Sequence, residues 1–550
     1  MKRFNSGIEF FGTHRDGDYY FADKSMLIGQ MLDKDPEGVF TFLRPRRFGK
    51  TLTLHMIESF FDITCKEKTW FDDLEISKHR EYDSYRNAFP VLYINLFSYS
   101  KTCDEFIESL KGKIDGIIRK HRYLMDSEKL SEEEKGLFRG LMHNPRWEYE
   151  VRHAFRNICA LISKHYGRKV VVIVDDYDFD VSRIKNKRDC REVTLFIKDI
   201  LMSLFNDNEY LQMGVMAGII QLNEEDFFGG FKKMYVNNIL SREFSDMFGF
   251  TDDEVKKMCE YCGHPEIADT LRDWYSHYRI GDADMYNPWD VINYINTDFT
   301  PVSFSSDNRS HRSIYSLLSI ADDRILDELT VLSSHESIRM DIDSAFRTES
   351  RDKHDAILAV MAATGYLTAV PDGTEYLLSI QNKEVYGVFA NVVYDWAFRH
   401  YGGICGESIL VSEIIKNDIQ STEEAMDRFV RDMRYADVLD ERFQFRKLIL
   451  CMHFDFRGRY DIGYSFDDIN RRYSIVLTDR EKINPDVVIE VRRSDREHLE
   501  SDAQEILSEI KENYSVHSPS GSVLYFVTTY MERGKFSEKK TYTLADSVRY

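Results

Sequence analysis

The feature that most constrains this 550-residue chain is an octapeptide at residues 44–51, RPRRFGKT, which ends in Gly-Lys-Thr. An apolar run at residues 39–43, VFTFL, precedes it, and apolar residues at helical spacing follow it, at Leu52, Leu54, Ile57, Phe60 and Phe61. A buried strand, a tight loop and a helix in this order are the setting in which a phosphate-binding loop works. The usual first glycine of G-x-x-x-x-G-K-[ST] is Arg44 here, so the motif alone is an incomplete match.

The chemistry of such a loop follows from its parts. Backbone N–H groups at a helix N-terminus attract phosphate. A lysine at position 50 would reach the β- and γ-phosphates of a nucleotide, and the hydroxyl of Thr51 would ligate Mg²⁺. We therefore expect nucleotide contacts from Arg46, Arg47, Phe48, Gly49, Lys50, Thr51 and Leu52.

The second half of a nucleotide site requires an apolar strand that ends in acid, and residues 169–178, KVVVIVDDYD, supply one. Asp175 would bind the nucleotide through Mg²⁺ and water, and Asp176 stands where a catalytic carboxylate would orient the attacking water. The alternative is an ordinary core strand that ends in solvated acids. A third strand-like run ends at Gln221, a candidate polar sensor, although buried strands with polar ends are common.

Composition limits the class of protein. A chain of this length should hold two to four domains, and 43% hydrophobic with 13% aromatic residues indicates folded material throughout. We expect a soluble, cytoplasmic protein without membrane segments, because no apolar run reaches 18 residues and the N-terminus lacks a signal-peptide core. The net charge of −21 argues against coating nucleic acid by bulk electrostatics but leaves room for a local basic groove.

The pattern of elements changes along the chain. Strand-like runs at 39–43, 90–95, 170–174 and 211–220 alternate with helical segments, which predicts an α/β domain with a mostly parallel sheet over residues 1–250. Residues 251–403 form a mainly helical domain, for which a winged-helix-like arrangement is one option. They contain a hairpin pattern at 366–380 and end at a joint, Gly402-Gly403. Residues 404–550 form a small α/β domain.

Taken in order, these residues resemble a large group of bacterial proteins, the predicted AAA-like ATPases with a C-terminal PD-(D/E)XK nuclease-like domain. The family's loop R-P-R-R-F-G-K-[ST] is intact, so the missing glycine is a family feature. The other matching sequence motifs are FADKS at 21–25, DDYD at 175–178, FGFT at 248–251, YNPW at 286–289, TGYL at 364–367 and NKEV at 382–385. The family has Glu where this chain has Asp176. That shorter carboxylate makes slow hydrolysis, or binding used as a switch, more plausible.

The resemblance also implies a restriction-endonuclease-like C-terminal domain. GRYD at 458–461 resembles the family's G-R-x-D strand, and VVIEVR at 487–492 resembles its E-x-K strand. Asp461 and Glu490 would then be Mg²⁺ ligands, with Glu441 as a third carboxylate. Arg492 replaces the catalytic lysine, and arginine clamps phosphate but cannot act as a base. Both an altered active nuclease and a degenerate, binding-only fold remain open.

Two functions follow as expectations. The first is an ATP-binding, Mg²⁺-dependent ATPase whose nucleotide state controls a nuclease-like domain acting on DNA or RNA. The second is a nucleotide-switched binding or scaffold protein with an inactive nuclease fold. AAA-type sites often take an arginine from a neighbouring subunit, so the resemblance includes a homo-oligomer among the partners. Cys259-x-x-Cys262 is interpreted as part of a helix that ends at Gly263, not as a metal site.

Overall fold

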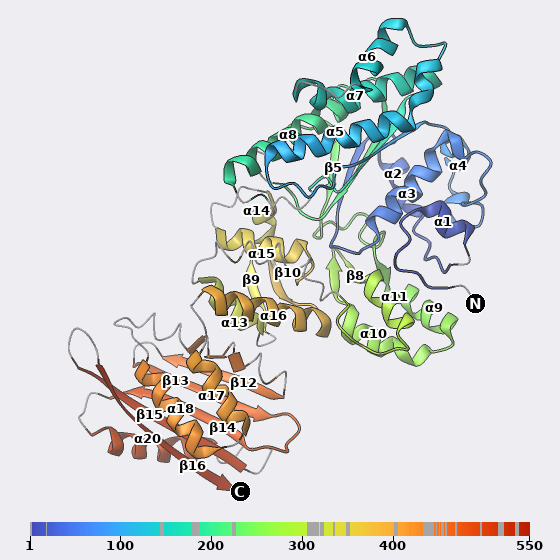
Figure 1. Ribbon diagram of the computed structural model, residues 1–550. Helices are drawn as coiled ribbons and strands as arrows, with labels where there is room; N and C mark the ends of the chain where they lie inside the picture. Colours follow the sequence, from blue (N-terminus) through green and yellow to red (C-terminus); the bar gives the residue numbers. More distant parts are fainter. Residues whose placement is uncertain are drawn as a thin grey trace. The chain divides into compact units, whose positions relative to one another are not determined.

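The computed structural model groups the chain into two compact units (Figure 1). The first comprises residues 1–317 and 339–386, and the second comprises residues 318–338 and 387–550. The residues that the structure describes are 3–17, 19–142, 148–178, 184, 186–222, 227–304, 318, 324–333, 336–347, 353–400, 405–416, 418–432, 445–446, 448–449, 451–452, 456, 459–467, 470–494, 498–514, 522–533 and 538–549. None of the helices in these ranges is long and apolar enough to cross a membrane.

The first unit is built on a five-stranded parallel sheet in the order β2-β3-β4-β1-β5. Its strands are β1 Val39–Leu43, β2 Val91–Asn95, β3 Val170–Asp175, β4 Leu211–Gly218 and β5 Met234–Asn237. Every residue of β1 and β3 is buried, as expected for parallel strands covered on both faces. The predicted α/β domain with a mostly parallel sheet is confirmed, and β5 is a strand that the sequence pattern did not reveal.

Helices cover both faces of this sheet, and alternate side chains of β3 point into two different cores. Val171 and Ile173 pack with α1 Phe11–Asp16, α2 Met26–Lys34 and α3 Lys50–Phe61. Val170, Val172 and Val174 pack on the other face with α5 Cys103–Lys120, α7 Glu148–Tyr166 and α8 Lys187–Phe205. Figure 1 shows these two groups of helices on opposite sides of the strands, with α4 Tyr82–Tyr85 beside the first group and α6 Glu132–Met142 beside the second.

The rest of the first unit contains two small three-stranded sheets. One sheet has the order β6-β8-β7, and three helices adjoin its strands in the sequence. Its elements are β6 Phe250–Thr251, α9 Asp252–Cys262, α10 Ala268–Tyr275, β7 Tyr278–Ile280, β8 Ala283–Tyr286 and α11 Pro288–Asn296. The other has the order β10-β11-β9, from β9 Ile338–Met340, β10 Leu367–Asp372 and β11 Glu375–Ile380, with α14 Ile342–Arg347 and α15 Lys353–Ala363.

Local sequence explains how the helices next to these sheets begin and end. Helix α9 starts with a capping box formed by Thr251 and Glu254 and ends at Gly263, whose φ of 79° is left-handed. Helix α11 starts at Pro288, and the side chain of Asn287 accepts a hydrogen bond from the backbone of Trp289. The end of α9 agrees with the interpretation of Cys259-x-x-Cys262 as part of a helix that ends at Gly263.

The second unit contains a five-stranded mixed sheet in the order β12-β13-β14-β15-β16, in which only β14 and β15 run parallel. Its strands are β12 Tyr460–Asp467, β13 Arg472–Asp479, β14 Asp486–Arg493, β15 Ser522–Arg533 and β16 Glu538–Arg549. Its helices include α13 Arg324–Ser333, α17 Cys405–Lys416, α18 Ile419–Asp432 and α20 Leu499–Tyr514, and α16 Lys383–His400 leads into it. This small α/β fold was expected, whereas its restriction-endonuclease-like nature stays a prediction. Gly402-Gly403, the expected joint, lies outside the described residues.

Candidate functional site

The loop between β1 and α3 has the backbone shape of a phosphate-binding loop. Strand β1 ends at Leu43 and helix α3 begins at Lys50, directly after Gly49. Gly49 has a φ of 76°, a left-handed conformation that glycine adopts at little cost, and Arg47 has a φ of 64°. The first N–H groups of a helix have no partner within the helix. They are therefore available to an anion in front of α3.

Arg44, the residue in the place of the first glycine, is a buried structural group. Its guanidinium donates to four backbone carbonyl oxygens, those of Leu43 and Asn237 at 2.9 Å, Phe244 at 3.0 Å and Asn238 at 3.2 Å. The side chain is fully buried, and burial lowers the pKa of Arg44 to about 9. Arg44 thus ties the start of the loop to the segment after β5, and its charge is directed away from any phosphate.

Lys50 is buried at the start of α3, and its amine lies on the loop itself. Its Nζ donates to the carbonyl oxygens of Arg44 at 3.0 Å and Pro45 at 2.8 Å. Burial lowers the pKa of Lys50, and the carboxylates of Asp176, Asp178 and Asp175 act in the opposite direction. An amine held by two neutral carbonyls in front of acidic side chains is placed to exchange these bonds for charge-assisted bonds to phosphate.

The structure brings the two expected metal ligands together. The Thr51 hydroxyl donates to Oδ2 of Asp175 at 2.9 Å, across the gap between α3 and the end of β3. The same oxygen accepts a hydrogen bond from the hydroxyl of Tyr93 at 3.0 Å, and Oδ1 accepts one from the backbone of Asp176 at 3.0 Å. Hydroxyl and carboxylate oxygens are ligands that suit Mg²⁺. Thr51 and Asp175 therefore fit this ion.

Asp176 follows directly and faces the cavity in front of Lys50 and Thr51. Its backbone is left-handed, with a φ of 51°, a conformation that is uncommon for residues other than glycine. Burial, with the charge of Asp175 as the next cause, raises the pKa of Asp176 to about 6. A carboxylate in this position suits the role of orienting or deprotonating a water molecule.

Asp178 is a functional position that we did not predict. Its Oδ2 accepts hydrogen bonds from the backbone N–H groups of Ile219 at 2.7 Å and Ile220 at 2.6 Å, so it holds the chain after β4 against the chain after β3. Burial raises its pKa. Ile219 and Ile220 line the cavity, whereas Gln221 is not among its lining residues. The structure therefore does not place Gln221 at the cavity, where a sensor would lie. The sequence signal for Asp178 was its position as the last residue of the DDYD motif.

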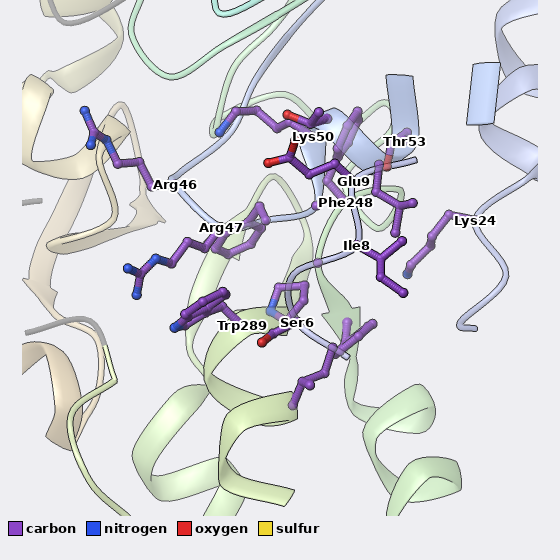
Figure 2. A pocket seen from close by; sticks show the side chains of 18 of the residues that line it. Ser6, Ile8, Glu9, Lys24, Arg46, Arg47, Lys50, Thr53, Phe248 and Trp289 are labelled. Atoms are coloured by element: carbon purple, nitrogen blue, oxygen red, sulfur yellow. The ribbon is translucent and has the colours of Figure 1, made fainter. Parts of the chain in front are cut away.

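Arg46 and Arg47 were expected to contact phosphate, and Arg47 is engaged elsewhere. Its guanidinium lies 4.4 Å from the ring centroid of Trp289 and donates to the carbonyl oxygen of Phe304 at 2.9 Å. Figure 2 shows the Arg47 side chain beside the Trp289 ring. Arg46 lines the same cavity. The cation–π contact connects the loop to α11, so Arg47 supports the loop through contacts with Trp289 and Phe304.

Two glycines, Gly249 and Gly365, support the other side of the loop, and both come from motifs far from it in the sequence. Phe48 packs edge-on against Tyr278, with ring centroids 5.0 Å apart, and against Gly249, where an added Cβ would lie 2.9 Å from the Phe48 ring. Pro45 packs on Gly365, where an added Cβ would lie 3.0 Å away. Both glycines have left-handed φ values, 83° and 86°. The FGFT and TGYL phrases thus form a platform for the loop, a role that needs glycine for conformation and for space.

The cavity in front of the loop has a volume of about 680 Å³, within the range typical of small-molecule sites. The lining includes Gly49, Lys50, Thr51, Leu52 and Asp176. The other lining residues are of two kinds, apolar ones such as Ile8, Phe21, Met56, Met247, Phe248, Phe250 and Ile292, and polar ones such as Ser6, Glu9, His14 and Lys24. Figure 2 shows Ser6, Ile8 and Glu9 of the N-terminal segment among the lining side chains. The cavity therefore offers polar groups for phosphates and apolar surface for a base.

Comparison with known proteins agrees with this geometry. Residues 5–228 match the family model described as predicted AAA-ATPase. That region contains the loop, β3 and its acidic end, and the match suggests ATP binding. A protein of Azotobacter chroococcum mcd 1, named "Uncharacterized protein in vnfD 5'region", is 26% identical over 298 residues, which cover 53% of this chain and 51% of the relative. The chain thus spans about half the length of this curated relative.

In the second unit, the carboxylates that the resemblance singled out do not meet. Asp461 on β12 lies opposite Thr478, whereas Glu490 on β14 lies opposite Ser474, with β13 between the two strands. Four residues along a strand correspond to roughly 13 Å. Ligands of one Mg²⁺ or Ca²⁺ ion lie only about 2–2.6 Å from it. The expectation that Asp461 and Glu490 hold one cation therefore does not agree with this register. Glu441, the proposed third ligand, lies outside the described residues.

Glu490 is instead the centre of an ion-pair cluster. It is fully buried, and its Oε1 accepts hydrogen bonds from Arg472 at 2.6 Å and Arg492 at 2.7 Å. Arg492 also donates to both carboxylate oxygens of Glu509, at 2.7 and 3.2 Å, and lowers the pKa of that side chain. Asp461 is 62% exposed and pairs with Arg480. These contacts account for Arg492 as a structural partner of two glutamates.

This cluster predicts unequal effects of two substitutions. Glu490→Ala is expected to lower the free energy of unfolding by about 2 kcal/mol, because it leaves two arginines beside a buried gap. We expect a smaller loss of free energy than for a fully buried ion pair, since Arg472 is partly exposed. Asp461→Ala should cost less than about 1 kcal/mol, as for other exposed pairs. Urea unfolding of the full chain, with hydrogen exchange in β13 and β14, measures both. Equal losses, or Mg²⁺-dependent DNA or RNA cleavage that both variants abolish, would contradict the ion-pair role.

Proposed function

We propose that this protein binds ATP in the 680 Å³ cavity of its first unit and hydrolyses it. One observation carries the proposal: Lys50, Thr51 and the adjacent acids Asp175 and Asp176 converge at the carboxyl ends of β1 and β3, where nucleotides bind to parallel sheets. The match of residues 5–228 to the predicted AAA-ATPase family supports the same ligand.

Each residue has a role in the proposal that its contacts support. Lys50 and the first N–H groups of α3 bind the β- and γ-phosphates, and Asp176 orients the attacking water. Thr51 would ligate Mg²⁺ directly, and Asp175 would hold it through water. The ion, when bound, supplies charge that stabilises the phosphoryl group during transfer. The apolar residues that line the cavity contact the base of the nucleotide.

Cleavage of nucleic acid is a weaker extension of this function. The cleavage hypothesis depended on Asp461, Glu490 and Arg492. Glu490 and Arg492 are already engaged in ion pairs. A DNA or RNA partner and a homo-oligomer stay predictions from the resemblance. The nucleotide site carries the proposal without them.

Calorimetric titration of the 550-residue chain with ATP tests the proposal. Lys50→Ala is expected to weaken ATP binding about 10- to 100-fold, because a charge-assisted bond to phosphate is worth about 1.5–3 kcal/mol. Lys78→Ala is a suitable control, since Lys78 is exposed and pairs with Glu75. Absence of ATP binding by the wild type, or equal affinity of Lys50→Ala, would overturn the proposal.

A further inference from the structure

Tyr93 is a residue of the nucleotide site to which none of the sequence motifs points. It lies on β2, which pairs with β3 in a register that places Asn95 beside Asp175. Tyr93 therefore lies two residues before the strand end, on the same face of the sheet as Asn95. From there its hydroxyl donates to Oδ2 of Asp175 at 3.0 Å.

Three donors fix the carboxylate of Asp175. Thr51 and Tyr93 donate to the same oxygen, Oδ2, and the backbone N–H of Asp176 donates to Oδ1. The terminal torsion of aspartate is broad, so each bond to a carboxylate oxygen narrows its orientation, and Tyr93 adds a second donor to Oδ2. With donors on both oxygens the plane of the carboxylate is set. The orientation of Asp175 is therefore defined before any nucleotide arrives.

Helix α3 holds the ring of Tyr93 in place. His55 stacks on it with ring centroids 4.5 Å apart and an interplanar angle of 6°. Its own Nδ1 lies 2.7 Å from Oε2 of Glu58, so the imidazole has a fixed orientation. Thr51 and His55 are four residues apart and lie on one face of the helix. One face of α3 thus contacts Asp175 directly through Thr51 and indirectly through the Tyr93 ring.

The hydroxyl of Tyr93 is a permanent donor. A tyrosine hydroxyl has an ordinary pKa of about 10, and that of Tyr93 donates to Asp175. The phenol therefore keeps its proton throughout the physiological pH range. It can only stabilise the ionised form of Asp175, the form that metal binding requires.

We propose that Tyr93 is a positioning residue for the metal that accompanies ATP, because its hydroxyl holds Oδ2 of Asp175 in the orientation that serves Mg²⁺. The inference rests on the proposed ATP site. It adds a partner beyond the ligands themselves, and groups that hydrogen-bond metal ligands typically change metal affinity about 10- to 100-fold when removed. Tyr93 touches neither the phosphates nor the reacting water in this proposal, so its effect appears in metal dependence.

Tyr93→Phe removes only the hydroxyl and leaves the ring for His55 to pack on. ATP binding is measured by calorimetry in EDTA and across a series of Mg²⁺ concentrations. We expect ATP affinity in EDTA to stay within about twofold of the wild type, while the Mg²⁺ concentration for half-maximal enhancement rises about tenfold. Tyr123→Phe is the matched control. It loses a hydroxyl that lies 2.9 Å from Nδ1 of His121, and Tyr123 is not a lining residue of the cavity.

A double-variant cycle separates positioning from a general loss of packing. If Tyr93 acts through Asp175, Tyr93→Phe should add no further change in Mg²⁺ dependence to Asp175→Asn. An unchanged Mg²⁺ dependence in Tyr93→Phe, or an equally large effect in the Asp175→Asn background, would overturn the inference while the ATP site stands. If the wild type binds no ATP with or without Mg²⁺, the proposed function fails and this inference with it. Thermal unfolding of each variant confirms that the compared proteins are folded.

Discussion

Replacing Arg44 by alanine is expected to lower the free energy of unfolding by about 3–5 kcal/mol, because it removes the four hydrogen bonds of a buried guanidinium and leaves a cavity in its place. Alanine removes the Arg44 donor from four carbonyl oxygens, those of Leu43, Asn237, Asn238 and Phe244. The oxygens of Asn238 and Phe244 keep a backbone donor, from Ser241 and Met247 respectively. Each unsatisfied buried acceptor costs about 1–3 kcal/mol, reduced where water enters the gap. The loss should appear in the absence of any nucleotide, because none of the four bonds involves one.

Arg46→Ala is the matched control for this prediction, since Arg46 lies two residues away in the same loop and is only half-buried. It should change the free energy of unfolding by less than about 0.5 kcal/mol, as for most surface positions. Denaturant unfolding of both variants gives the comparison. If Arg44→Ala is as stable as Arg46→Ala but loses ATP affinity, Arg44 is a phosphate ligand and its structural role is wrong.

The structure explains which parts of this site the sequence could predict. The strand, the loop and the helix were predictable because their signals are local: an apolar run, Gly49 and a helical pattern from Leu52 onward. The acids at the end of β3 were predictable for the same reason. The role of Arg44 was not, because its acceptors at Asn237, Asn238 and Phe244 come about two hundred positions later and contribute only backbone atoms.

Tyr93, together with Asp461 and Glu490 in the second unit, shows a second reason why the sequence alone could not predict these contacts. A tyrosine inside a strand pattern gives no sign of which strand will lie beside it, and the pairing of β2 with β3 determines its partner. Asp461 and Glu490 were expected to share one cation, but β13 lies between their strands and the hairpin register separates them further. Register depends on side-chain packing across strands, which spacing along the chain does not reveal.

Replacing Asp176 by asparagine is expected to slow ATP hydrolysis about 100-fold or more, in line with the contribution of a positioned general base. Asparagine has nearly the same shape but cannot accept a proton, and it leaves Lys50, Thr51 and Asp175 in place. ATP affinity should therefore stay within about threefold of the wild type. With a pKa of about 6, the wild-type carboxylate is mainly ionised at pH 8, so phosphate release measured at that pH compares a base with a neutral amide.

Asp176→Glu tests the length of the side chain separately from its charge. Asp176 faces open cavity, so one additional methylene has room, and the family that the chain resembles carries glutamate at this position. We expect Asp176→Glu to hydrolyse ATP faster than the wild type, by up to the roughly hundredfold that an ångström of misplacement can cost. A wild-type rate in Asp176→Asn would remove Asp176 from the catalytic role. Tight ATP binding without hydrolysis in the wild type, together with hydrolysis in Asp176→Glu, would instead identify a nucleotide switch in which the shorter carboxylate keeps bound ATP intact.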